Sequence, residues 1–99
     1  MYATMIQCDM HAIDSSEERG RTGRLLGTTL AALPSFVAFV ALDAEGEAGT
    51  VAALCIFEDR AGVEGANCVI AQWQREYPAT VGTGIRRLGA GVVIVQKGL

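Results

Sequence analysis

The sequence predicts an α+β domain with its elements in the order βαββαβ, the ferredoxin-like arrangement. Three observations lead to this prediction: a central pair of apolar runs joined by an acidic turn, a helical pattern on either side of that pair, and a run of strand length near each end. Right-handed β-α-β crossovers would place both helices on one face of a four-stranded antiparallel sheet. At 99 residues, we expect a single domain spanning 1–99.

The central pair of apolar runs, within residues 35–59, is expected to form a β-hairpin. Successive side chains of a strand point to opposite faces. Here both alternating sets are apolar, since Phe36 and Val40 alternate with Val37 and Phe39. A hairpin with one face in water would alternate apolar and polar residues instead. We therefore expect both faces of the hairpin to be covered.

Capping signals place the elements before the hairpin. A first strand is expected over 2–10. A helix should start near Ser15, because residues 15–18, Ser-Ser-Glu-Glu, fit a capping box with acidic groups at the positive end of the helix dipole. Pro34 would end this helix. Three arginines along it are expected to lie on a solvated face: Arg19, Arg21 and Arg24.

The elements after the hairpin follow from helical periodicity. Asp59 can cap a second helix, which should stop at Pro78. A glycine-rich loop over 79–91 would then lead to the last strand, over 92–96. The apolar residues of this second helix share one face: Val63, Ala66, Ile70, Trp73 and Tyr77.

Two helices on one face of the sheet would leave the other face bare, although the hairpin and the last strand are apolar on that side as well. Hydrophobic residues make up 51% of the chain, and the mean hydropathy is +0.31. Soluble monomers rarely expose a contiguous apolar patch of more than roughly several hundred Å². We therefore expect the chain to associate with itself through the sheet face, as a homodimer or a larger oligomer.

Charge and composition exclude several classes of partner. The formal net charge of −3 gives no reason to expect nucleic acid. There is no apolar run long enough to predict a membrane span, and residues 1–4 lack the basic region of a signal peptide, so we expect a cytoplasmic protein. Three cysteines at unrelated spacings, Cys8, Cys55 and Cys68, are interpreted as free and mostly buried thiols.

Two short segments and one helix carry a family resemblance. Residues 33–36, Leu-Pro-Ser-Phe, enter the second expected strand, and residues 57–59, Phe-Glu-Asp, leave the third. With Trp73 on the second helix, they resemble the dimeric α+β barrel superfamily, particularly its antibiotic-biosynthesis-monooxygenase-like branch. That branch usually has Pro-Gly-Phe where this chain has Ser35. The resemblance implies two protomers forming a barrel whose lumen binds a small, often aromatic or polyketide-like, molecule.

The resemblance also bears on cofactors. Haem-degrading members resemble one another in an asparagine on the first strand and in a histidine that follows the helix-two tryptophan. Here Gln7 stands roughly where the asparagine would be, and no histidine follows His11. We expect no haem and no other cofactor. A metal site at Cys8 and His11 is not expected either, because residues three apart on a strand face opposite sides.

The candidate catalytic pair is His11 and Asp9, which point the same way on an extended chain, so that the carboxylate could orient the imidazole as a general base. The alternative is a solvated strand end. A second set consists of the candidate substrate-binding residues Gln7, Asn67, Trp73, Tyr77 and Arg86. For Trp73 and Tyr77 the alternative is packing of the second helix on the sheet, and for Arg86 it is a surface ion pair.

Two functions are therefore compatible with the sequence. The family resemblance implies a cofactor-independent monooxygenase acting on a small aromatic or polyketide-like substrate held in the barrel. The alternative is a non-catalytic module that binds a small hydrophobic or aromatic ligand in the same place. Convergence of the polar candidates on one site would favour the enzyme, and a wholly apolar lumen would favour the binding module.

Overall fold

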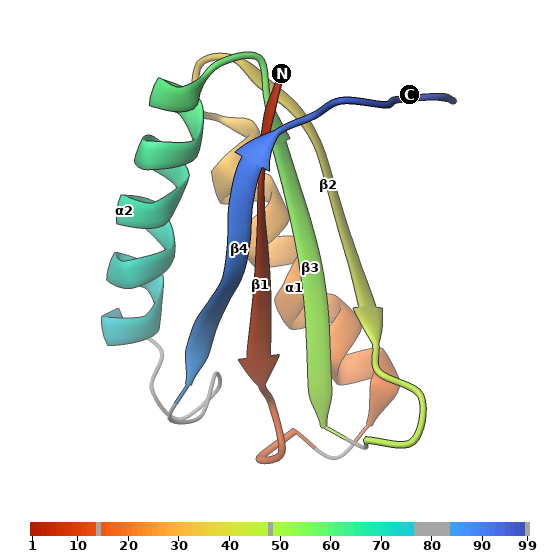
Figure 1. Cartoon of the computed structure of the whole chain (residues 1–99). Coiled ribbons are helices and arrows are strands. Elements are labelled where there is room, and N and C mark those ends of the chain that lie inside the picture. The colour runs from red at the N-terminus through yellow and green to blue at the C-terminus, as the bar shows by residue number, and fades with distance from the viewer. Residues whose placement is uncertain (14, 48, 77–83, 99) are drawn as a thin grey trace.

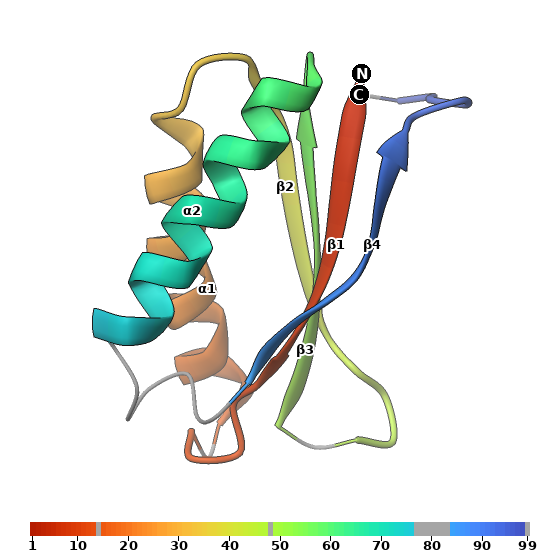
Figure 2. The ribbon, with the colours of Figure 1, turned by 60° about the vertical axis from the view of Figure 1, so that its left-hand side comes forward.

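The computed structural model describes residues 1–13, 15–47, 49–76 and 84–98. Its four strands form one antiparallel sheet in the order β2-β3-β1-β4. Both helices cover the same face of that sheet (Figures 1 and 2). The predicted ferredoxin-like βαββαβ fold is therefore confirmed. The elements in chain order are β1 (Tyr2–Asp9), α1 (Ser16–Ala31), β2 (Phe36–Asp43), β3 (Thr50–Phe57), α2 (Arg60–Glu76) and β4 (Ile85–Val92).

The hydrophobic core lies between the helices and the facing side of the sheet. Alternate residues of β1 and β3 point into it, as the strand period of two requires. The predicted apolar face of the second helix is confirmed for its four described members, and Tyr77 lies outside the described residues. The fully buried or nearly buried core includes Ile6, Cys8, Leu26, Leu30, Val51, Ala53, Cys55, Phe57, Val63, Ala66, Ile70 and Trp73.

Helix α1 begins as predicted, because the Ser15 hydroxyl accepts a hydrogen bond from the backbone N–H of Glu18 at 3.1 Å. The prediction that Arg19 lies on a solvated face is wrong. Its side chain is only 12% exposed and forms a two-pronged ion pair with Asp43 at the end of β2, at 2.9 and 3.2 Å. A third bond runs from Arg19 to the carbonyl of Ile13. The bonds from Arg19 to the Asp43 carboxylate hold the pKa of Asp43 below its ordinary value.

The junctions leading into β2 and α2 are bonded to each other. The Asp59 carboxylate caps α2 by accepting from the Gly62 N–H at 2.9 Å, and it also accepts from the Ser35 hydroxyl at 3.2 Å. The Glu58 N–H donates to the Ser35 carbonyl at 2.8 Å. Ser35 has a φ of 64°, in the left-handed region that favours glycine. Its hydroxyl thus adds a bond that a glycine at this position could not make.

The last strand differs from the prediction. It spans Ile85–Val92, whereas the sequence predicts 92–96. Its position follows from its pairing with β1, in which the last paired residues are Tyr2 and Val92. One further bond runs from the Val93 N–H to the Met1 carbonyl. The glycine-containing stretch 85–92 is therefore the strand, and the more apolar stretch 93–96 is not.

The sheet face away from the helices, called the open face below, carries mainly apolar side chains. Its residues follow from the register, since cross-strand partners share a face. Met5, Val40 and Leu42 are 49%, 54% and 56% exposed there. The open face consists of Ala3, Met5, Gln7 and Asp9 of β1, Ala38, Val40 and Leu42 of β2, Ala52, Leu54 and Ile56 of β3, and Arg86, Gly89 and Gly91 of β4.

Neither described helix is long and apolar enough to span a membrane.

We expect Gly62→Ala to lower the free energy of unfolding by about 1–3 kcal/mol, as overpacking does. A Cβ at this position would lie 2.5 Å from the Ser35 Oγ and 2.7 Å from the Phe57 Cβ. The matched control is Gly65→Ala in the same helix, where a Cβ meets no atom within 4 Å. That control should stabilise the chain by about 1 kcal/mol or less. Urea unfolding measures both, and equal effects would contradict the close packing at Gly62.

The three cysteines should differ in reactivity. Burial raises the pKa of the Cys8 thiol and of the Cys55 thiol to about 11, so both are protonated at neutral pH. Cys68 lies exposed on α2. We expect a maleimide to modify Cys68 quickly in the folded protein and the other two only after denaturation, as read by intact mass. Rapid modification of all three in the folded protein would contradict this.

Candidate functional site

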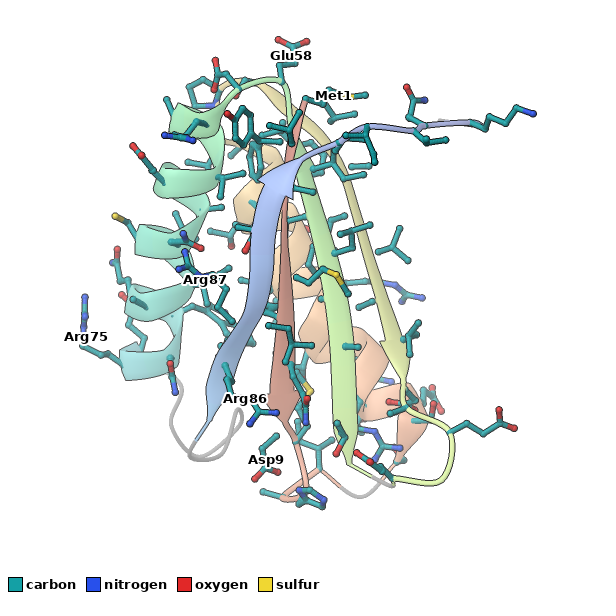
Figure 3. The ribbon with its side chains drawn as sticks, in the orientation of Figure 1. Met1, Asp9, Glu58, Arg75, Arg86 and Arg87 are labelled. Atoms are coloured by element: carbon teal, nitrogen blue, oxygen red, sulfur yellow. The ribbon has the colours of Figure 1, made fainter. Side chains whose placement is uncertain are left out.

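One end of the open face carries a polar cluster, defined as Gln7, Asp9, His11 and Arg86. Gln7 of β1 lies opposite Arg86 of β4 in the sheet register, and the Arg86 guanidinium donates to the Gln7 Oε1 at 3.3 Å. Asp9 lies two residues beyond Gln7 and therefore on the same face. Figure 3 shows Asp9 and Arg86 at the same end of the sheet, while Arg87 points toward α2. Four side chains from three segments thus gather at the rim of an apolar surface.

Asp9 and His11 form the closest contact of the cluster. The Asp9 carboxylate accepts a hydrogen bond from the His11 backbone N–H at 3.0 Å and a second from the ring nitrogen Nδ1. These two bonds, the ring bond first, lower the pKa of Asp9. Asp9 is therefore a carboxylate at neutral pH. With Nδ1 bonded to Asp9, the Nε2 atom is the ring nitrogen that can accept a proton.

Gly49 holds the turn that carries His11. It has a φ of 87°, and a Cβ on it would lie 2.8 Å from the His11 ring and 2.9 Å from the His11 Cα. Its carbonyl accepts from the Met10 N–H at 2.7 Å. The turn after β1 therefore packs closely on the end of the hairpin. This role is not apparent from the sequence, in which Gly49 is one of several glycine and acidic residues in a turn.

The candidate substrate-binding residues do not all lie together. Gln7 and Arg86 lie on the open face, whereas Asn67 and Trp73 belong to α2, on the other side of the sheet. Trp73 is 6% exposed and belongs to the core, as its packing alternative predicts, and Asn67 is half-buried. Tyr77 lies outside the described residues. Among the described members of the predicted set, only Gln7 and Arg86 join the His11 pair, because the sheet separates them from Asn67 and Trp73.

A groove of about 800 Å³ lies between α1 and β2 and is called the edge groove below. Its lining includes Gly20, Gly23 and Gly27, which share one helical face because they are three and four residues apart. This groove is not among the expectations from the sequence, although the spacing of the three glycines was the available signal. The polar cluster does not line the edge groove. The four side chains of the polar cluster lie on an open surface of the single chain.

The described residues contain no group of three or more histidine, cysteine, aspartate or glutamate side chains arranged to hold a metal ion. The polar cluster supplies the chemistry of its own groups. It offers a carboxylate, an imidazole held by that carboxylate, a guanidinium and an amide. Such a set can accept a proton at His11 and bind a negatively charged oxygen at Arg86.

Comparison with known proteins gives matches by structure alone. No family model and no curated protein matches the sequence. The chain superposes on SnoaB, a cofactor-independent oxygenase from Streptomyces nogalater, with a TM-score of 0.71 and 10% identity, over 96% of this chain and 94% of that one. A Nitrosomonas europaea protein provisionally described as an antibiotic biosynthesis monooxygenase matches with a TM-score of 0.70 and 10% identity, over 96% of this chain and 100% of that one.

This chain has the antibiotic biosynthesis monooxygenase-like fold. A third structure, a dimeric ferredoxin-like protein from an uncultured marine organism, matches over the full length of both chains with a TM-score of 0.64 and 14% identity. The resemblance to that branch is therefore confirmed at the level of the fold. At such low identity the likeness shows the fold and leaves the reaction to be argued from the site.

We expect His11→Ala to raise the pKa of Asp9 toward its ordinary value, because the His11 ring is the main cause of the lowered value. A carboxylate with a lowered pKa stabilises the fold above its unfolded-state pKa and loses that effect as the pH falls through the folded-state value. The variant should therefore lose less stability than the natural chain on acidification.

Carboxyl NMR titration measures this shift, with Asp43 as the internal control. Its pKa is lowered by Arg19, so it should stay lowered in the His11→Ala variant. An unchanged Asp9 titration in the variant would contradict the pairing of Asp9 with His11.

Proposed function

We propose that this protein is a cofactor-independent monooxygenase acting on a small aromatic or polyketide-like substrate. The observation that supports the proposal is the gathering of Gln7, Asp9, His11 and Arg86 at one end of an otherwise apolar sheet face. The fold shared with SnoaB, whose name describes a cofactor-independent oxygenase, adds support of a more general kind.

The proposed active form is a homodimer or larger oligomer that associates through the open face. Met5, Val40 and Leu42 are about half exposed on that face in the single chain. Packing the sheet of a second copy against them would remove apolar surface from water and enclose a lumen between the two sheets. One structural neighbour is described as a dimeric ferredoxin-like protein. The polar cluster would then lie at the mouth of the lumen.

In the proposed reaction, a phenol or enol bound on the open face loses a proton to the His11 Nε2 atom, and the Asp9 carboxylate stabilises the resulting imidazolium. Arg86, held by Gln7, binds the substrate oxygen as negative charge develops on it. The electron-rich anion reacts with O₂. Oxidation of an activated CH₂ to a C=O keeps one oxygen atom and releases the other as water, so the substrate supplies every electron.

A second candidate function is a non-catalytic module that binds a small hydrophobic or aromatic ligand on the same face. The observation favouring it is that the open face is apolar apart from the polar cluster. Roles in binding for Asn67, Trp73 and Tyr77 stay predictions under either function, as does a cytoplasmic location.

Oxygen consumption with dihydroxyaromatic substrates tests the enzyme. We expect His11→Gln to lower kcat by about 10²-fold or more, as loss of a general base does, with the melting temperature and the oligomeric state nearly unchanged. Arg86→Gln should mainly raise KM. Its matched control is Arg87→Gln on the same strand, which points toward α2 and should have little effect (Figure 3).

Full turnover in the His11→Gln variant would contradict the assignment of the base. Saturable ligand binding without oxygen uptake, found by mass spectrometry of co-purified molecules and by titration, would favour the binding module instead.

A further inference from the structure

The turn between β1 and α1 carries His11, and hydrogen bonds hold it at both ends. The Ile13 N–H donates to the Met10 carbonyl at 2.9 Å, which is the bond that closes a four-residue β-turn. At the start of the turn, the Met10 N–H donates to the Gly49 carbonyl at 2.7 Å. At its end, the Ile13 carbonyl accepts from the Arg19 guanidinium at 2.8 Å. His11 therefore lies between two anchored residues.

The His11 ring itself has little packing to hold it. The side chain is 63% exposed, so surrounding side chains do not fix its rotamer. The Asp9 carboxylate bonds its Nδ1 atom, and Gly49 lies close on one side. Whether the ring meets Asp9 correctly therefore depends on where the backbone of the turn places it.

Arg19 connects this turn to a distant part of the chain. Its Nε and Nη2 atoms donate to the two carboxylate oxygens of Asp43, at 2.9 and 3.2 Å, while Nη1 donates to the Ile13 carbonyl. The Arg19 side chain is only 12% exposed. A guanidinium holds its donors in one rigid plane, so two bonds to Asp43 fix the direction of the third. The position of the Ile13 carbonyl is thus set relative to Asp43.

Both anchors of the turn belong to one end of the hairpin. Asp43, which holds Arg19, is the last residue of β2 and lies opposite Val51 in β3. Gly49, which accepts from Met10, immediately precedes β3. The ends of β1 and β2 and the start of α1 lie at the same end of the molecule (Figure 1). The hairpin end and the first turns of α1 together form the support for His11.

We propose that Arg19 is a positioning residue for His11, placing the imidazole against Asp9 by holding the end of the turn. Arg19 does not belong to the polar cluster and acts through the Ile13 carbonyl. A displacement of a reacting group by about 1 Å can cost about 10²-fold in rate, so such support matters for a general base. This inference rests on the proposed function, in which His11 takes the substrate proton.

Arg19→Lys tests the positioning by carboxyl NMR titration of Asp9. Lysine keeps the positive charge, but its single ammonium lacks the planar fork that joins Asp43 to the Ile13 carbonyl. We expect the pKa of Asp9 to rise toward its ordinary value, because the bond from the His11 ring is the largest cause of its lowering. Since the charge is retained, the rise would report movement of the ring. An unchanged Asp9 titration would overturn the proposal.

The matched control is Arg21→Lys on the same helix. Arg21 is exposed and pairs with Glu17 and Glu18 of α1 itself. This control should leave the pKa of Asp9 where it is. An equal rise in both variants would mean that any change in α1 reaches Asp9, and the specific role of Arg19 would then be wrong.

Asp43→Asn tests the other half of the support and does not depend on folding of an Arg19 variant. The amide replaces one acceptor oxygen with a donor, which breaks the two-pronged contact. Loss of a negative charge by itself would lower the pKa of Asp9, so a rise would again report movement of the His11 ring. The double variant with Arg19→Lys should show no larger rise than the larger single effect, because both changes break one contact. Fully additive rises, or none, would overturn the proposal.

Kinetics with dihydroxyaromatic substrates then separate this proposal from the proposed function. We expect Arg19→Lys to lower kcat by about tenfold or more with KM nearly unchanged, because Arg19 displaces the base without touching the substrate. If the pKa of Asp9 rises but the natural chain consumes no oxygen, the monooxygenase is wrong and the support of His11 by Arg19 stands. If the natural chain is active and Arg19→Lys leaves kcat unchanged, the positioning role is wrong and the monooxygenase stands.

Discussion

The packing of both helices on one face of the sheet is the constraint on which the remaining structure depends. Right-handed crossovers force this arrangement for a βαββαβ chain. One face is therefore closed by Leu26, Leu30, Ile70 and Trp73, while the other keeps Met5 and further apolar side chains uncovered. An apolar face without a cover is unfavourable in water, and association of two copies removes it most simply. The proposed lumen and its polar mouth both follow from that.

The polar cluster forms where the apolar part of the open face ends. β1 brings Gln7 and Asp9 to this point on one face, and β4 brings Arg86 beside Gln7 through the register of the two strands. The turn after β1 is then held by the close approach of Gly49, which places His11 against Asp9. An imidazole held in this way at the edge of an apolar surface suits deprotonation of a flat, weakly acidic substrate.

The glycines of α1 show how local stability and surface shape compete. Each costs about 1 kcal/mol of helix propensity relative to alanine. Gly27 is explained by its contact with Phe39, whereas Gly20 and Gly23 touch nothing that requires them. Their missing side chains leave a groove along β2, beside α1.

Signals that act over a few residues were sufficient for much of this protein. The caps at Ser15 and Asp59, the hairpin and the stripe of α2 are set by local backbone and side-chain chemistry, and the two-residue spacing of Asp9 and His11 already put them on one side of β1. Contacts between distant segments required the tertiary structure. They include the pairing of Arg86 with Gln7, the ion pair of Arg19 with Asp43, and the choice of 85–92 over 93–96 as the last strand. That choice depends on the register with β1, which pairs Tyr2 with Val92, and not on the propensity of either stretch, because a strand exists only where a neighbouring backbone can accept its hydrogen bonds.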